Sequence, residues 1–385
     1  TRSYRDLQWL LTCLTALAAF IAFHTLVQGV TGRFLFATEN QSDYLSAVSG
    51  FHLSGSTVTR AGSFLINPDW NGLYLAMSLF PAAGLIFTGA TRAWRIFAAA
   101  TCGLVLLALL FTFTTSSWLA ASVGFVFFLF IGVPKRYRWW MLGGLITMML
   151  VIWAVFFKQV ALLYAHATAS NETTLRLGAW ETALRIIRAD PFTGIGMGYN
   201  LYLDRAERFR VALQTQALAH PHNSYLELAA FAGLPVLLAF LALLGMMGAD
   251  VVRAYRRSDR RQKPLFGGVI AALIVLSVNS LFINGWTLPP FVCLGWLLIG
   301  AVTSRAVQAA QADAARIAPL PASLKPNKQE QPAAQQQRGR RSGLPRRRGN
   351  RAPGTSSDAS TGSAQPTRAE VAVITMDALP RERGA

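Results

Sequence analysis

Two histidines lie immediately before the predicted start of a helix. His220 and His222 are separated by a proline and followed by Asn223. A helix N-terminus carries partial positive charge, which disfavours imidazolium and keeps His222 neutral, as a general base requires. The same helix end attracts anions such as a diphosphate. His222 is therefore a candidate base beside an anion site, and the alternative is that both histidines are structural.

Arg176 is a candidate anion ligand on a helix predicted over residues 171–189. At about 100° per residue the apolar side chains of this segment share one stripe. The stripe consists of Leu177, Trp180, Ala183, Leu184 and Ile187. Arg176 lies within it, four residues before Trp180, and a packed arginine is costly unless an anion meets it. The alternative is an arginine that snorkels to the bilayer edge. On the opposite side of the helix we expect Glu181 and Arg185 to pair.

Local signals predict how these two segments are connected. Pro191 and three glycines at 194, 196 and 198 predict a tight turn after the helix. Residues 199–214 predict a second helix. Ser224 and Glu227 match an S-x-x-E capping box, so we expect Glu227 to cap the next helix. No third ligand accompanies the two histidines, so the sequence predicts no metal site.

Composition places these segments in a membrane protein. Of 385 residues, 53% are hydrophobic and 14% are charged, against about 25% charged in soluble domains. Eight apolar stretches have roughly the length that spans a bilayer as a helix. They are 7–30, 70–90, 96–113, 118–133, 139–157, 225–247, 265–283 and 288–302. The sequence therefore predicts an all-α polytopic membrane protein.

Basic residues fill alternate connections between these spans and so predict one orientation. Arg92 and Arg95, residues 135–138 and residues 253–263 would face the cytoplasm. Loops 31–69 and 158–222 would then face outward. We expect residues 1–304 to form the transmembrane domain.

Residues 305–385 carry 14 basic and 6 acidic residues among Gln, Pro, Gly and Ser. They predict a disordered cytoplasmic tail, which is either a solvated extension or a segment attracted to anionic lipid. No aromatic residues interleave its arginines, which argues against a nucleic-acid partner.

Ionisable residues are scarce within the spans and concentrated in the second outward loop. Transporters usually carry such residues in their spans and often show inverted repeats. The spans of this sequence are nearly free of ionisable residues, with His24 in the first and Glu227 and Asp250 at the two ends of the sixth, and no inverted repeat is found. This pattern favours a membrane enzyme with an outward-facing site. Because ATP and nucleotide sugars are not expected outside, the substrate must bring its own activation, for example as a lipid diphosphate.

Three segments resemble the O-antigen ligase and polymerase family of bacterial inner-membrane glycosyltransferases. Residues 60–75, RAGSFLINPDWNGLYL, are similar to the family's R-x-G-T-F-x-N-P-N-x-x-A-x-Y-L. Residues 176–198 are similar to R-x-x-x-W-x-x-A-L followed by P-x-x-G-x-G-x-G. Residues 220–233, HPHNSYLELAAFAG, are similar to H-x-H-N-x-(Y/F)-L ending in a glycine. Members typically have more than eight spans, so we expect further spans upstream.

The resemblance implies a GT-C-like transmembrane helix bundle with a large periplasmic loop that contains helices. It implies metal-independent, inverting transfer without a cofactor. Glycan would pass from undecaprenyl diphosphate to lipid A–core at the periplasmic face of the bacterial inner membrane, among membrane lipids. By position, His222 would be the base and Arg176 would bind the diphosphate. Further substrate-binding residues would be His220, Asn223, Arg60 and Trp180.

The identity of the acceptor remains open at this stage. An O-antigen or exopolysaccharide polymerase and a protein O-oligosaccharyltransferase would use the same donor, and a polysaccharide or lipid transporter is a more distant alternative. The family usually has T-x-S-R at the outer start of one span, where this chain reads Thr114-Thr115-Ser116-Ser117. Arg60 or a loop arginine would then partner Arg176, or the chain is a polymerase or a divergent transferase.

Overall fold

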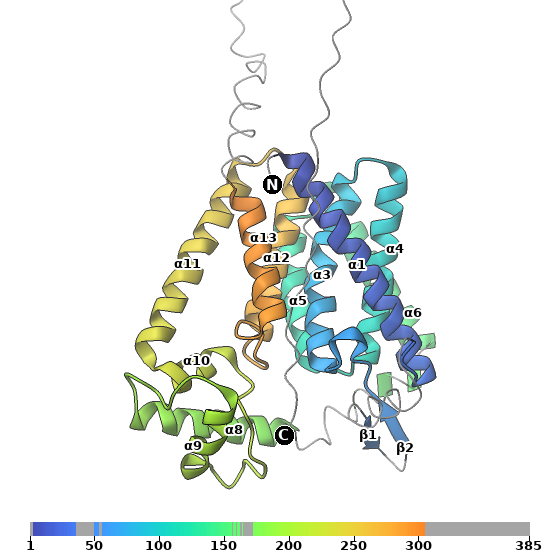
Figure 1. Cartoon of the computed structure of the whole chain (residues 1–385). Coiled ribbons are helices and arrows are strands. Elements are labelled where there is room, and N and C mark those ends of the chain that lie inside the picture. Colours follow the sequence, from blue (N-terminus) through green and yellow to red (C-terminus); the bar gives the residue numbers. More distant parts are fainter. Residues whose placement is uncertain are drawn as a thin grey trace, which may run out of the picture. The chain divides into compact units, whose positions relative to one another are not determined.

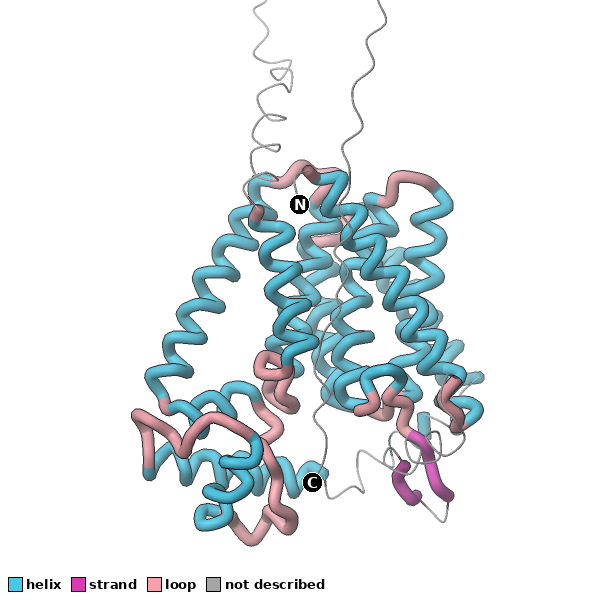
Figure 2. Tube along the Cα trace, viewed as in Figure 1, coloured by secondary structure: helices cyan, strands magenta, loops and turns pink. Residues whose placement is uncertain are grey.

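The structure is a computed structural model that describes residues 3–35, 50–53, 56–155, 157–158, 160–161, 164 and 172–304. Helices dominate these residues (Figure 2). The predicted tail, 305–385, lies outside the described residues. All of the described residues belong to one compact unit, Thr1–Pro319.

Apolar helices match all eight predicted spans within the described ranges. They are α1 (Tyr4–Thr31), α3 (Pro68–Thr88), α4 (Arg92–Phe111), α5 (Thr115–Ile131), α6 (Arg138–Val155), α11 (Leu234–Arg257), α12 (Lys263–Asn279) and α13 (Pro289–Thr303). Five are long and apolar enough to cross a membrane: α1, α3, α4, α11, and α6 together with the short helix η2 (Lys135–Tyr137) before it. The others, α5, α12 and α13, are shorter apolar helices. The all-α polytopic class is confirmed.

Helix α3 is central to the packing of this unit, because it contacts α1, α4, α5 and α12. Its backbone approaches that of α12 at two glycines. A Cβ atom on Gly84 would lie 2.7 Å from the carbonyl oxygen of Pro264, and one on Gly268 would lie 2.4 Å from that of Phe80. Small residues allow such close approach between membrane helices. In contrast, most side chains of α6 and α11 are exposed, as expected of helices that face lipid.

The connections between the helices lie at two opposite ends of the bundle (Figure 1). The start of α1, the connection between α11 and α12, and the end of α13 lie at one end. The opposite end carries β1 (Gly50–Leu53), β2 (Ser56–Thr59), α8 (Glu172–Ala189), α9 (Tyr199–Ala206) and α10 (Ser224–Ala232). The basic connection 253–263 therefore lies away from both long loops, in agreement with the alternation of charge. Which end faces the cytoplasm stays a prediction.

A small hairpin adds to the helical fold. Strands β1 and β2 pair antiparallel, with Gly50 opposite Thr59 and Leu53 opposite Ser56. The short helix η1 (Ser63–Leu65) follows. The sequence analysis did not predict the hairpin, because a single short pair gives little periodicity to detect.

The predicted span 225–247 is wrong in its bounds. Gly233 interrupts it with a positive φ of 87°, and it separates the nine-residue α10 from α11. A Cβ atom on Gly233 would lie 2.2 Å from the carbonyl oxygen of Phe192, so both conformation and space require glycine. The span is Leu234–Arg257, and Ser224–Ala232 is a separate helix at the end of the bundle that carries the long loops.

The helix predicted over 199–214 is also shorter than expected. α9 ends at Ala206 and is followed by one 3₁₀ turn, η3 (Glu207–Phe209). The chain then turns at Val211, whose carbonyl accepts a hydrogen bond from the backbone of Gln214. This turn packs against Gly178 of α8, where a Cβ atom would lie 2.5 Å from the Gln214 nitrogen. Tertiary packing thus ends the helix earlier than its periodicity indicates.

Candidate functional site

A buried polar network fixes residues 60–69, the segment that leads into α3. The backbone N–H of Ser63 donates to Gln28 Oε1 at 2.8 Å, and His24 Nδ1 lies 2.9 Å from Ser63 Oγ. Asn71 Nδ2 donates to the carbonyl oxygen of Ala61 at 2.9 Å. These contacts tie the segment to α1 and α3. They determine where Arg60 and Asp69, at its two ends, can place their side chains.

Asp69 joins two arginines that are far apart in the sequence. Arg60 Nη2 lies 2.5 Å from Asp69 Oδ1, and Arg176 Nη2 lies 3.2 Å from Asp69 Oδ2. The three side chains are 12%, 15% and 20% exposed, in the order Arg60, Asp69, Arg176. The structure therefore brings Arg60 and Arg176 together around one shared carboxylate, which the sequence analysis did not single out.

Arg60 lies beside the turn that precedes α5. Its Nε donates to the carbonyl oxygen of Thr112 at 3.2 Å, and Thr114 Oγ1 lies 3.3 Å from Asp69 Oδ1. Ser117, where the resembling family has arginine, is buried and accepts a hydrogen bond from Asn279 Nδ2 at 2.9 Å. A guanidinium thus reaches the start of α5 from another segment. This geometry supports the expectation that Arg60 partners Arg176.

Asn223 is the N-cap of α10. Its Oδ1 accepts hydrogen bonds from the backbone N–H groups of Tyr225, at 3.0 Å, and Leu226, at 3.1 Å. Such a cap contributes about 1 kcal/mol. The predicted capping box of Ser224 and Glu227 is wrong, because Ser224 Oγ instead bonds to the carbonyl of Ile283 and accepts from the backbone of the α12–α13 loop.

His222 adopts an uncommon backbone conformation, with φ at +52°. Its backbone N–H donates to His220 Nδ1 at 3.1 Å, and the two ring centroids are 4.3 Å apart. Burial, together with the neighbouring His222, lowers the pKa of His220 to about 3. Because Nδ1 of His220 accepts a bond, the proton of its neutral ring belongs on Nε2. His220 therefore holds the backbone of His222.

Asp69 links Arg176 to the electrostatic surroundings of His222. Asp69 contacts Arg176 and lies close enough to His222 for the two groups to interact electrostatically. The site thus gathers α3, α8 and the segment before α10.

A buried carboxyl lies behind the two histidines. Glu227 is 3% exposed, and its Oε2 lies 3.8 Å from His220 Nδ1. Burial raises the pKa of Glu227 to about 7, although a hydrogen bond with Thr287 opposes this shift. Tyr199 packs its ring 5.5 Å from that of His220, and its hydroxyl accepts a hydrogen bond from Asn284 Nδ2 at 3.0 Å. Burial, with help from the Glu227 charge, also raises the pKa of Tyr199.

The buried face of α8 differs from the face that its apolar stripe predicts. Leu177 and Leu184 are exposed, whereas the buried positions are Gly178, Ala179, Thr182, Ala183 and Ile186. Small side chains decide this face, because they let α10 and the turn at 211–214 approach the helix. Trp180 packs toward the α12–α13 loop, with its ring 6.2 Å from that of Phe282. The predicted pair of Glu181 and Arg185 is confirmed, at 3.0 Å.

Residues 100–241 match the profile of the family described as O-Antigen ligase. This segment is an O-antigen ligase family domain. It contains Arg176, Trp180, His220, His222 and Asn223, while Arg60 and Asp69 precede it. A search of curated proteins found no match to the chain.

The O-antigen ligase domain indicates the general activity of the protein. It supports an integral membrane enzyme of ligase or polymerase type that transfers glycan. The family implies, in general terms, a lipid-linked glycan and lipid A–core as partners.

Within the O-antigen ligase domain, the glycine-rich turn docks α8 onto α10. The backbone N–H groups of Ile195 and Gly196 donate to the carbonyls of Ala230 and Phe231, each at 2.9 Å. Leu234 N donates to the carbonyl of Pro191 at 2.7 Å. The predicted tight turn is confirmed, and it connects the helix that carries Arg176 to the helix that follows His222.

We expect Glu227→Gln to raise the thermal unfolding midpoint at about pH 9 and to change it little at about pH 5. The pKa of folded Glu227, about 7, lies above its ordinary value of 4.5, so the folded protein holds this proton more tightly than the unfolded chain. The stability from the neutral carboxyl is complete below pH 4.5 and is lost as pH rises through 7. The alkaline gain is on the order of 3 kcal/mol. Glu207→Gln, at an exposed position, is the control, and equal shifts at both pH values would contradict the assignment.

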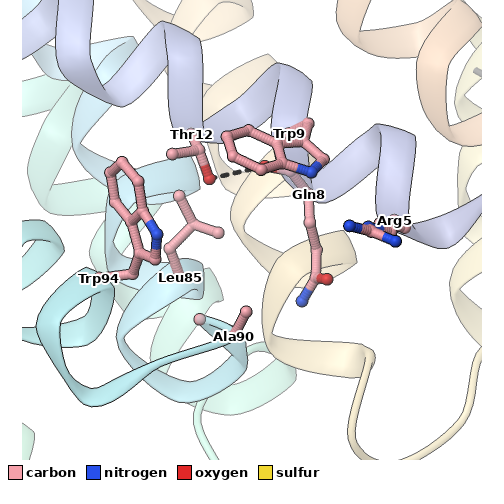
Figure 3. Close-up of a pocket in the computed structure, with 8 residues that line it drawn as sticks. Arg5, Gln8, Trp9, Thr12, Leu85, Ala90 and Trp94 are labelled. Carbon is pink, nitrogen blue, oxygen red and sulfur yellow. Dashed lines mark hydrogen bonds between the residues drawn. The ribbon is translucent and has the colours of Figure 1, made fainter.

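A separate pocket lies at the end of the bundle where α1 begins. It has a volume of about 110 Å³ and is lined by Arg5, Gln8, Trp9, Thr12, Leu85, Gly89, Ala90 and Trp94 (Figure 3). Thr12 Oγ1 donates to the carbonyl of Gln8 at 2.8 Å. No predicted site residue lines this pocket, so it is distinct from the site around Asp69.

Metal-ligating side chains do not cluster in the part of the chain that the structure describes. There, no three of His, Cys, Asp and Glu lie close enough together to hold an ion. The metal-independent reaction stays a prediction.

Proposed function

We propose that the protein is an O-antigen ligase that transfers glycan from undecaprenyl diphosphate to lipid A–core at the periplasmic face of the inner membrane. The observation that carries this proposal is the ion pair that joins Arg176 to Asp69, a carboxylate that also interacts electrostatically with His222. The O-antigen ligase family match over residues 100–241 supports it. The orientation follows the positive-inside rule, and the tail after residue 304 would then be cytoplasmic.

In the proposed reaction, His222 accepts the proton of the acceptor hydroxyl. The hydroxyl oxygen attacks the anomeric carbon of the first sugar as the bond from that carbon to the diphosphate oxygen breaks. The diphosphate leaves with the bonding electrons, and a single displacement inverts the anomeric centre. Arg176 stabilises the developing charge, with Arg60 as the second positive charge nearby, in a site that largely excludes water. Two guanidiniums in these positions make a metal ion unnecessary.

The remaining predicted site residues support this pair. His220 holds the backbone of His222 through Nδ1, and Asn223 begins the helix behind it. We propose that the ring of Trp180, which lies beside Phe282, packs against the glycan. His220, Asn223 and Trp180 would contact the substrate next to the reacting atoms.

The experiment that tests the function is complementation of two bacterial strains, one lacking its O-antigen ligase and the other lacking its O-antigen polymerase. We expect the chain to restore glycan-capped lipid A–core in the first strain and no long chains in the second. Restoration of chain length alone would make the protein a polymerase, and glycan on protein would make it an oligosaccharyltransferase. Transport of unmodified glycan that survives His222→Ala would make it a transporter.

A reporter fusion tests the sidedness. A fusion after Arg256 should report the cytoplasm, and a periplasmic signal would overturn the orientation.

A further inference from the structure

We propose that Asp69 is a positioning residue that holds Arg176 ready for the donor diphosphate, with Arg60 as its anchor. This inference rests on the proposed function and adds a residue outside the O-antigen ligase domain. Asp69 does not contact the reacting atoms in this account. It acts through the guanidinium of Arg176.

The two carboxylate oxygens of Asp69 have different partners. Oδ1 lies 2.5 Å from Arg60 and 3.3 Å from the Thr114 hydroxyl, whereas Oδ2 lies 3.2 Å from Arg176. Arg60 is itself held by the carbonyl of Thr112. The backbone N–H of Asp69 donates to Asn67 Oδ1, the N-cap of α3, at 2.8 Å. One oxygen is therefore anchored to the bundle, and the other is directed at Arg176.

Arg176 needs such a partner because its helix packs elsewhere. α8 packs against α9, α10 and η3, while the ion pair with Asp69 reaches across to α3. An arginine side chain loses considerable rotamer entropy when it is ordered. If Asp69 orders Arg176 before the donor binds, the donor does not bear that cost.

Charge also favours this arrangement. Two guanidiniums held close together in a largely buried site repel each other strongly unless an anion lies between them. Asp69 supplies that anion and leaves the group of three with one net positive charge. The site then remains attractive to a diphosphate while both arginines keep their positions.

Asp69→Asn tests the proposal, because it keeps the size of the side chain and removes its charge. We expect the full chain in detergent to bind undecaprenyl diphosphate about 10- to 100-fold more weakly by native mass spectrometry. Binding of undecaprenol, which has no phosphate, should not change, whereas a merely structural defect would weaken both. Asp69→Glu should bind more tightly than Asp69→Asn. Asp190→Asn, which removes the exposed partner of Arg208, is the matched control and should bind like the wild type.

A double variant shows whether Asp69 acts through Arg176. In an Arg176→Ala background, Asp69→Asn should change the affinity for undecaprenyl diphosphate by less than about twofold, because coupled residues are not additive. Additive losses, or unchanged affinity in Asp69→Asn alone, would overturn the inference. If Asp69→Asn does not accumulate, Arg60→Gln removes the anchor instead, and wild-type affinity in that variant would also overturn it. If Arg176→Ala itself binds undecaprenyl diphosphate normally, the proposed function fails rather than this inference alone.

Discussion

His222→Ala is expected to abolish glycan capping of lipid A–core while the protein still accumulates in the membrane. Removal of a general base costs about 10²- to 10⁴-fold in rate, which is enough to remove capped product from a gel of lipopolysaccharide. The fold should tolerate the change, because the hydrogen bond between the two histidines uses the backbone N–H of His222. The measurement is capped lipid A–core per unit of inserted protein, in cells that depend on this chain.

His52→Ala provides a control for that result. His52 lies on β1 in the first long loop, at the same end of the bundle as the proposed site, and no step of the mechanism uses it. The His52→Ala variant should produce as much capped lipid A–core as the wild type. Normal capping by His222→Ala, with normal amounts of protein, would exclude His222 as the base.

Arg176→Ala is expected to lower transfer by about 10²- to 10³-fold, because it removes a preorganised charge from the leaving diphosphate. Arg176→Lys should recover part of the activity, since it restores the charge but lacks the planar fork that binds two oxygens. The rate of undecaprenyl diphosphate release measures the effect directly.

Arg185→Ala is the matched control on the same helix. Arg185 pairs with Glu181 at an exposed position, and such surface pairs contribute only about 0.3–0.5 kcal/mol. Transfer by Arg185→Ala should therefore stay near the wild-type rate. If Arg176→Lys is as inactive as Arg176→Ala, geometry matters more than charge. If Arg176→Ala is fully active, the diphosphate binds elsewhere.

The length of the apolar stretches was sufficient to predict most helices of the bundle. Span length, the basic connections and the glycine-rich turn all depend on local signals. Local signals did not predict the features that tertiary packing determines. Gly233 reads as an ordinary membrane-helix glycine, yet the close approach of Phe192 makes it a break between two helices.

The candidate site could be predicted only in part for the same reason. Arg176 and His222 stood out because their residue types and local settings indicate chemistry. Asp69 did not, because its importance depends on Arg176, which is 107 positions away in the sequence. Its one local signal is that it follows Asn67-Pro68 within the segment that resembles the family. Tyr199 and Asn284 were missed similarly, because Tyr199 reaches His220 from another segment and Asn284 in turn bonds to Tyr199.

A single-turnover assay tests the central claim most directly. The purified full chain would be mixed with excess lipid A–core and a limiting amount of undecaprenyl-diphosphate-linked glycan, and both products would be followed over time. The account predicts that the wild type releases one undecaprenyl diphosphate for each glycan joined, and that His222→Ala binds the donor with wild-type affinity but releases nothing above background. Release by His222→Ala at the wild-type rate would contradict the account.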